Sequence, residues 1–169
     1  METNLQQEKI MDMLRRPATG KRVDVISLKI VRESAGLYGI SRFTGPQEAA
    51  DMVRPLISTA DREIFLVMSV NTKMEPMAVE IVSVGTLNAC LVEMREVFKH
   101  AILNNAAGIV CFYNHPSGEP EPSREDQLMT ENLKAAGGLL GISLVDHIIV
   151  TEEQYYSFKE QKDGGNQDL

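Results

Sequence analysis

The side chains best suited to chemistry gather in one short polar segment, residues 113–126, whose sequence is YNHPSGEPEPSRED. His115 offers an imidazole and Asp126 a carboxylate, and both groups are accepted ligands of zinc. Prolines stiffen the loop between them, and rigid polar loops at strand ends commonly carry catalytic groups. We therefore expect His115 and Asp126 to face each other across the loop. Two ligands are one fewer than catalytic zinc sites normally use.

The flanking elements explain how this segment is positioned. The apolar run 108–112 predicts a buried strand that ends directly on Tyr113 and the loop after it. Ser123 is a favourable N-cap residue and predicts a helix from about 123 to 136. The pair Gly137-Gly138 is expected to end that helix.

Apolar periodicity along the rest of the chain predicts further helices and strands in alternation. The expected helices cover 44–56 and 89–104, and the expected strands cover 64–70, 77–84, 142–151 and 155–158. This alternation indicates an α/β or α+β domain with a mixed β-sheet flanked by helices.

The chain is expected to have three parts. Residues 1–42 form an N-terminal extension with a short helix over 3–16 and a strand over 22–31, residues 43–159 form the main domain, and residues 160–169 form a disordered tail. The edge strands of the predicted sheet leave room for a homodimer.

Composition narrows the classes of protein and site. Hydrophobic residues make up 43% of the 169, enough for an ordinary core, and no apolar run approaches the roughly 20 residues that span a bilayer. The polar N-terminus lacks the features of a signal peptide, so a cytoplasmic protein without membrane attachment is expected. Only Cys90 and Cys111 are present, which gives no disulfide framework, and their apolar surroundings indicate small core residues.

The net charge argues against a general role in binding nucleic acid. The chain has 17 basic and 24 acidic residues, giving −7, and its basic residues are scattered. Proteins that bind a duplex usually gain affinity from clustered lysine and arginine side chains that neutralise phosphates.

Several motifs resemble the RadC branch of the JAB/MPN domains, also called JAMM proteins. The JAMM signature is His-x-His-Pro followed by Ser-x-x-Asp, with an upstream glutamate, and RadC proteins have the form His-Asn-His-Pro-Ser-Gly and then Pro-Ser-Arg-Glu-Asp. This chain matches at 114–118 and 122–126, and also resembles RadC at 83–88, 95–98, 139–142 and 146–147. The resemblance extends over roughly residues 43–159 in order and spacing.

The resemblance implies a JAB/MPN metallopeptidase-like fold with cytidine-deaminase-like layering, and it implies roles for particular residues. His115 and Asp126 would be zinc ligands, and Ser123 would stabilise the oxyanion of the tetrahedral intermediate. Glu63 matches the upstream glutamate and would transfer a proton from zinc-bound water to the leaving amine.

Tyr113 is the departure from the motif, because it stands where the first zinc-binding histidine belongs. Tyrosine is absent from the usual zinc ligand set, and its phenol has an unperturbed pKa near ~10. Three outcomes remain open: a site that still binds zinc, a lost or weakened site, and a repurposed site with Tyr113 as a ligand.

The resemblance thus implies a zinc-dependent peptidase or isopeptidase acting on a peptide or protein, with an altered metal motif. The alternatives are a non-catalytic MPN-like module for protein interaction and, from the family's repair association alone, a DNA-repair accessory protein. His147, beside Asp146 in an apolar stretch, is interpreted as a buried structural histidine, and His100 as an ordinary surface or groove residue.

Overall fold

The computed structural model describes residues 42–85 and 92–164, together with seven single positions nearer the N-terminus, namely Glu8, Met11, Asp12, Arg15, Ile26, Ser27 and Ile30. For residues 162–164 it describes the backbone alone. The helix expected over 3–16, the strand expected over 22–31 and most of the expected tail lie outside the described residues. The chain divides into two compact units, Met1–Val31 and Arg32–Leu169, and the elements below belong to the second unit.

A five-stranded mixed sheet forms the centre of this unit, in the order β2-β1-β3-β4-β5. Its strands are β1 (Ile64–Val70), β2 (Pro76–Val84), β3 (Gly108–Asn114), β4 (Ser143–Val150) and β5 (Tyr155–Ser157). All neighbours pair antiparallel except β3 and β4, which are parallel. The expected α+β class, a mixed sheet flanked by helices, is confirmed.

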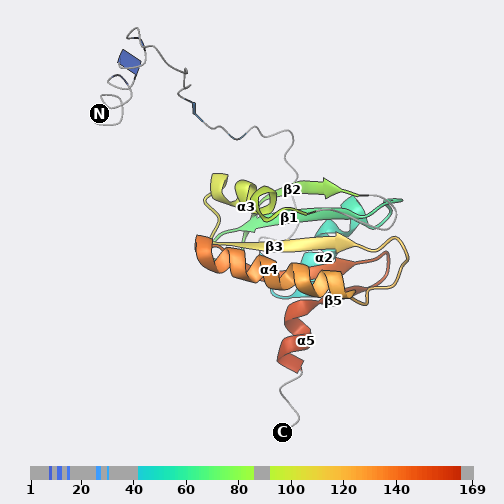
Figure 1. The fold of residues 1–169 in the computed structure, drawn as a ribbon. Helices are drawn as coiled ribbons and strands as arrows, with labels where there is room; N and C mark the ends of the chain where they lie inside the picture. The colour runs from blue at the N-terminus through green and yellow to red at the C-terminus, as the bar shows by residue number, and fades with distance from the viewer. Residues whose placement is uncertain are drawn as a thin grey trace. The chain divides into compact units, whose positions relative to one another are not determined.

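Helices cover both faces of the sheet (Figure 1). They are α2 (Pro46–Ile57), α3 (Met94–Leu103), α4 (Arg124–Leu140) and α5 (Phe158–Gly164). α2 packs on one face, over a core that includes Met68, Phe112 and Ile148. α3 and α4 pack on the other, over Phe65, Phe98 and Leu133. Burying both faces explains why β1 is apolar at every position except Ser69 rather than alternating.

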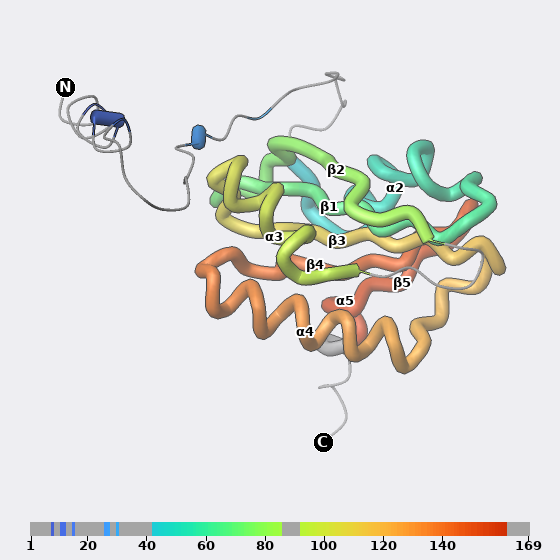
Figure 2. Tube along the Cα trace, turned by 45° about the horizontal axis from the view of Figure 1, so that its top comes forward, coloured from blue at the N-terminus to red at the C-terminus, as the bar shows by residue number. Residues whose placement is uncertain are grey.

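The parallel pair requires a crossover, and α4 provides it between β3 and β4. Figure 2 shows α4 running along the outer side of the sheet beside these strands. In this arrangement the carboxyl ends of β3 and β4 lie at the same end of the sheet. Loops at such ends commonly form ligand sites. Within the described residues, every helix is too short or too polar to cross a lipid bilayer.

The C-terminus of α4 differs from the sequence prediction. Gly137 and Gly138 do not end the helix, which continues to Leu140 and stops at Gly141, whose φ of 69° is the left-handed conformation of a C-cap glycine. Gly137 serves packing instead, because a Cβ built there would lie 2.4 Å from the carbonyl oxygen of Ile142.

Three other boundaries also differ from the predictions. α3 begins at Met94 rather than 89, with Glu93 as its extended N-cap residue. β3 continues through Asn114, because its pairing with β4 extends that far. β5 ends at Ser157, and α5 occupies 158–164, where a strand end and a disordered tail were expected. The Ser157 hydroxyl accepts a hydrogen bond from the Glu160 backbone N–H, which supports this first helical turn.

Replacing Gly137 by alanine is expected to lower the free energy of unfolding by about 1–3 kcal/mol, because the new methyl group must displace backbone atoms. Gly138→Ala is the matched control in the same helix. A Cβ built at Gly138 meets nothing within 4 Å, so this change should stabilise by about 0.5–1 kcal/mol through better helix propensity. Urea denaturation followed by circular dichroism measures both, and equal changes would contradict the packing role of Gly137.

Candidate functional site

Strand pairing gathers the candidate residues at one end of the sheet. Phe65 in β1 lies opposite Tyr113 in β3, so Glu63, immediately before β1, lies near the carboxyl end of β3. The loop after β3 then carries His115, and the first turn of α4 carries Asp126. Glu63 and Tyr113 are far apart in sequence, and the antiparallel pairing of β1 with β3 brings them close in space.

Asn114 fixes the backbone on both sides of Glu63. Its side-chain oxygen accepts a hydrogen bond from the Ile64 backbone N–H at 2.5 Å, and its amide nitrogen donates to the carbonyl oxygen of Arg62 at 3.0 Å. Asn114 itself is 1% exposed. Because these two bonds flank Glu63 on its chain, they hold that residue beside the end of β3.

Tyr113 and Glu63 contact each other directly. The Tyr113 hydroxyl donates a short hydrogen bond to Glu63 Oε2, and both side chains are half-buried. The ring of Tyr113 packs against Phe65 with ring centroids 6.2 Å apart, and meets the ring of His115 edge-on at 5.5 Å. The carboxylate assigned to proton transfer by the resemblance is therefore occupied by a phenol.

His115 is held from both sides of its ring. Nδ1 donates to the backbone carbonyl oxygen of Glu119 at 2.8 Å, and Nε2 lies 3.6 Å from Asp126 Oδ2. A ring nitrogen bonded to a backbone carbonyl is the arrangement that commonly fixes the tautomer of a metal-binding histidine. His115 and Asp126 therefore face each other, as the sequence predicted.

Ser123 and Asp126 form a capping box at the start of α4. The Ser123 backbone N–H and hydroxyl both donate to Asp126 Oδ2, at 2.7 and 2.6 Å, and the Asp126 N–H donates to Ser123 Oγ at 3.1 Å. These bonds satisfy backbone groups that a helix start leaves unpaired. The predicted N-cap role of Ser123 is confirmed, and its hydroxyl proton is directed at Asp126.

The pKa values of His115 and Asp126 shift in the directions of an ion pair. Burial alone would lower the pKa of His115, but hydrogen bonds to Asp126 and to the Glu119 carbonyl raise it above its usual range. Burial alone would raise the pKa of Asp126, but its bonds to His115 and Ser123 lower it. Protonated His115 is stabilised here, so a metal ion would have to displace that proton.

The donor set matches only part of a zinc site. Two ligand atoms about 2.1 Å from a tetrahedral zinc ion lie about 3.4 Å apart, and the 3.6 Å between His115 Nε2 and Asp126 Oδ2 is close to that. Among the described residues, however, no three histidine, cysteine, aspartate or glutamate side chains converge as a metal site requires. The residues present therefore do not fit a catalytic zinc ion, which needs three such ligands.

A second polar cluster, missed from the sequence, lies beneath α3. His100 Nε2 is 2.8 Å from Ser69 Oγ, and His100 Nδ1 is 3.3 Å from Glu80 Oε2. The connectivity is that of a serine–histidine–acid triad, but Ser69 is 0% exposed and His100 only 6%, so no substrate reaches the hydroxyl. The interpretation of His100 as an ordinary surface or groove residue was wrong, since the helix turns it inward, toward β1 and β2. The sequence offered one signal for this cluster: Ser69 is the only polar residue in the apolar run of β1.

His147 and Cys111 are buried structural residues, as predicted. Thr130 donates its hydroxyl proton to the Asp126 carbonyl, so Thr130 Oγ1 accepts a hydrogen bond from His147 Nδ1–H at 2.8 Å. The His147 ring stacks on Phe158 with centroids 5.0 Å apart, and its Nε2 has no hydrogen-bond partner in the described part of the chain. Burial raises the pKa of the Cys111 thiol, which keeps it protonated. Cys90 lies outside the described residues.

Comparisons with known proteins agree with this fold and with the motifs. The profile of a family described as RadC-like JAB domain matches residues 43–163. A UPF0758 protein of Thermotoga maritima is 48% identical over 101 residues, which cover 60% of this chain and 46% of the relative. One of Rubrobacter xylanophilus is 47% identical over 117 residues, 69% of this chain and 51% of the relative. One of Methanosarcina mazei is 39% identical over 120 residues, which cover 71% of this chain and 52% of the relative. The chain spans about half the length of these curated relatives.

Asn114→Ala should lower the free energy of unfolding by about 2–4 kcal/mol, because it leaves the N–H of Ile64 and the carbonyl of Arg62 without their partner. Asn114→Asp keeps the acceptor for Ile64 and should cost less. Urea denaturation gives both values, and hydrogen exchange at the Ile64 amide should accelerate in the alanine variant. An alanine variant as stable as the native chain would refute the bracing role of Asn114.

The stability of the domain should depend on pH through His147. Burial lowers the pKa of His147 to about 4, against the attraction of Asp126, whereas an unfolded histidine titrates near ~6.5. Between these values the unfolded chain binds the proton and the folded chain does not. Above about pH 6.5 this titration therefore costs the folded domain no stability. Below that pH the free energy of unfolding falls as the pH falls, by at most about 1.4 kcal/mol per pH unit.

The matched variant for this measurement is His147→Asn, which keeps a donor for Thr130 and removes the titration. Urea denaturation of both proteins from pH 7 to pH 4 isolates the difference between their pH slopes, since the remaining titrating groups are shared. Parallel slopes for the two proteins would exclude His147 as the source.

Proposed function

Since this chain belongs to the RadC-like JAB domain family, we propose that it acts as a non-catalytic protein-binding module in which Tyr113 closes the site used for zinc chemistry. The observation that carries the proposal is the hydrogen bond from Tyr113 to Glu63. It engages the acidic side chain that would otherwise activate water, and it puts a phenol where a third conventional zinc ligand is needed.

The remaining contacts at the site support the same function. Asp126 is engaged by Ser123 in the capping box and by His115 as an ion pair, so its charge is already balanced. These contacts, together with the backbone bonds from Gly118 to His115 and from Gln127 to Ser123, hold the loop and the helix start together. A loop organised in this way can present a fixed surface to a partner.

A metal-dependent peptidase or isopeptidase is the second candidate function. It is favoured by the separation of His115 Nε2 from Asp126 Oδ2 and by the carbonyl that anchors His115 Nδ1. For it to operate, Glu63 would have to leave the Tyr113 hydroxyl and Ser123 would have to turn its hydroxyl proton away from Asp126. Each hydrogen bond so broken must be replaced.

Zinc affinity separates the two functions. We expect Tyr113→His to bind zinc at least about 100-fold more tightly than the native chain, since loss of even an outer hydrogen-bond partner of a ligand costs about 10–100-fold. Tyr113→Phe is the matched control, because it removes the hydroxyl without supplying a ligand, and it should bind zinc as weakly as the native chain. Competition with a chromophoric chelator gives the dissociation constants.

The contradicting result is a native chain that binds about one zinc ion as tightly as Tyr113→His and cleaves a peptide or isopeptide bond. The metal-dependent hydrolase would then replace the binding module. If only Tyr113→His binds zinc tightly, Tyr113 is the residue that closes the site.

A further inference from the structure

A cavity of about 380 Å³ lies beside the candidate site and shares His115 with it. Three segments line it: residues 58–60 after α2, the start of the loop after β3, and residues 151–154 in the turn between β4 and β5. The cavity thus opens at the same end of the sheet as Tyr113 and Glu63. A peptide that lies across that end of the sheet can therefore contact both the cavity and the Tyr113–Glu63 pair.

The lining is acidic. Glu152 and Glu153 contribute two carboxylates, Ser58, Thr59 and Thr151 contribute hydroxyls, and neither lysine nor arginine lines the cavity. Glu152 and Glu153 are exposed, and neither forms an ion pair or hydrogen bond with another described residue. Their charge is therefore available to a ligand. His115 also lines the cavity, but its charge is balanced by Asp126, so the two free carboxylates favour a cation.

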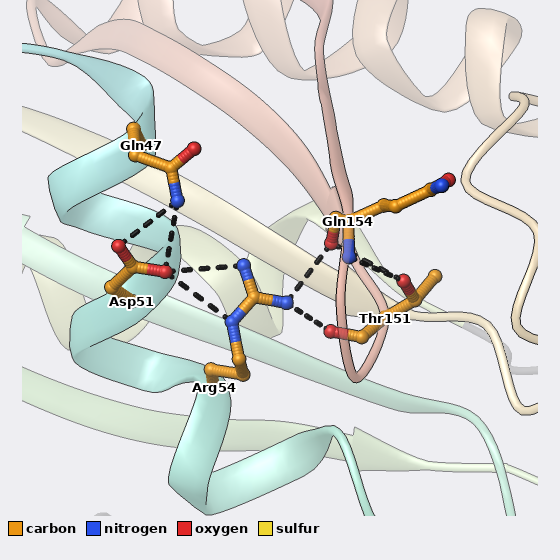
Figure 3. A network of polar contacts seen from close by, with 5 residues as sticks. All are labelled: Gln47, Asp51, Arg54, Thr151 and Gln154. Carbon is orange, nitrogen blue, oxygen red and sulfur yellow. Dashed lines mark hydrogen bonds and ion pairs between the residues drawn. The ribbon is translucent and has the colours of Figure 1, made fainter.

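Arg54 fixes the acidic wall without neutralising it (Figure 3). Its Nη1 donates to the backbone carbonyl oxygens of Thr151 and Gln154, the latter at 3.0 Å. Its charge is balanced by Asp51, whose Oδ1 lies 3.2 Å from Nη2. The turn is closed further by the Gln154 N–H, which donates to Thr151 Oγ1 at 3.0 Å. Glu152 and Glu153 therefore project from a braced turn.

We infer that this cavity binds the arginine or lysine side chain of a protein partner. The volume suits the terminal part of such a side chain, the carboxylates supply the opposite charge, and the hydroxyls can accept its N–H groups. The inference rests on the proposed function in taking the partner to be a protein, and it adds a specificity for basic residues. The acidic net charge of the chain favours encounter with such a partner.

The test uses N-acetyl-arginine amide as the probe and follows backbone amide signals of the full chain by NMR. N-acetyl-citrulline amide is the neutral isostere, and N-acetyl-lysine amide tests the other basic side chain. We expect arginine and lysine probes to shift signals of residues 58–60, Gly118 and 151–154, with millimolar affinity that weakens as salt is added. The citrulline probe should produce no saturable shift.

The matched variants are the double change Glu152→Gln with Glu153→Gln and, as control, Glu131→Gln on the exposed face of α4. The double variant should weaken the arginine probe about five- to tenfold, as expected for two exposed ion pairs. The control should leave the affinity unchanged. Three results would overturn the inference: the citrulline probe binds as tightly as the arginine probe, the shifted signals lie elsewhere on the surface, or Glu131→Gln weakens binding as much as the double variant does.

Binding of the probe does not depend on zinc, so the two proposals fail separately. A native chain that binds zinc tightly, cleaves a peptide or isopeptide bond and also binds the probe would refute the non-catalytic function and leave the cavity as a basic-residue pocket. If the native chain binds zinc weakly and does not bind the arginine probe, only the inference about the cavity is refuted.

Discussion

The site depends on one buried amide. Asn114 joins the end of β3 to the start of β1 through two hydrogen bonds to the main chain, at Arg62 and Ile64. Without it, the backbone on either side of Glu63 would lose both of these bonds and keep only the bond from the Gly85 N–H to the Glu63 carbonyl oxygen, so the acceptor of the Tyr113 hydroxyl would be held less firmly. The next residue, His115, then begins the loop that leads to α4. Asn114 thus lies where the chain passes from the sheet to the loop. Its bonds help to position Glu63 beside Tyr113, and the loop that carries His115 begins at the next residue.

Much of the fold could be predicted because its patterns are local. The run Ile64–Val70 predicts its strand because burial on both faces leaves a sequence that is apolar at every position but one. Pro46 suits the first turn of α2 and Ser123 the N-cap of α4, and both features depend only on residues within one turn of a helix. His115 and Asp126 were expected to face each other for a similar reason, since a short stiff loop joins them.

What could not be predicted depends on contacts between distant parts of the chain. Gly137 looked like a helix end because glycine usually is one, and only the approach of the Ile142 carbonyl reveals its packing role. His100 looked exposed because nothing near it in sequence indicates Ser69 or Glu80. The contact between Tyr113 and Glu63 follows from strand register, which local periodicity does not specify. The motif located the site, but the register determined how its residues engage each other.

The bond between Tyr113 and Glu63 also has a genetic consequence. Tyrosine and histidine codons differ only at their first base, so a closed site and one with the family's histidine are separated by a single nucleotide change. The scaffold around position 113 is held by Asn114 and by the capping box at Ser123, and neither requires the phenol. The two forms can therefore be exchanged by one base change without rebuilding the domain.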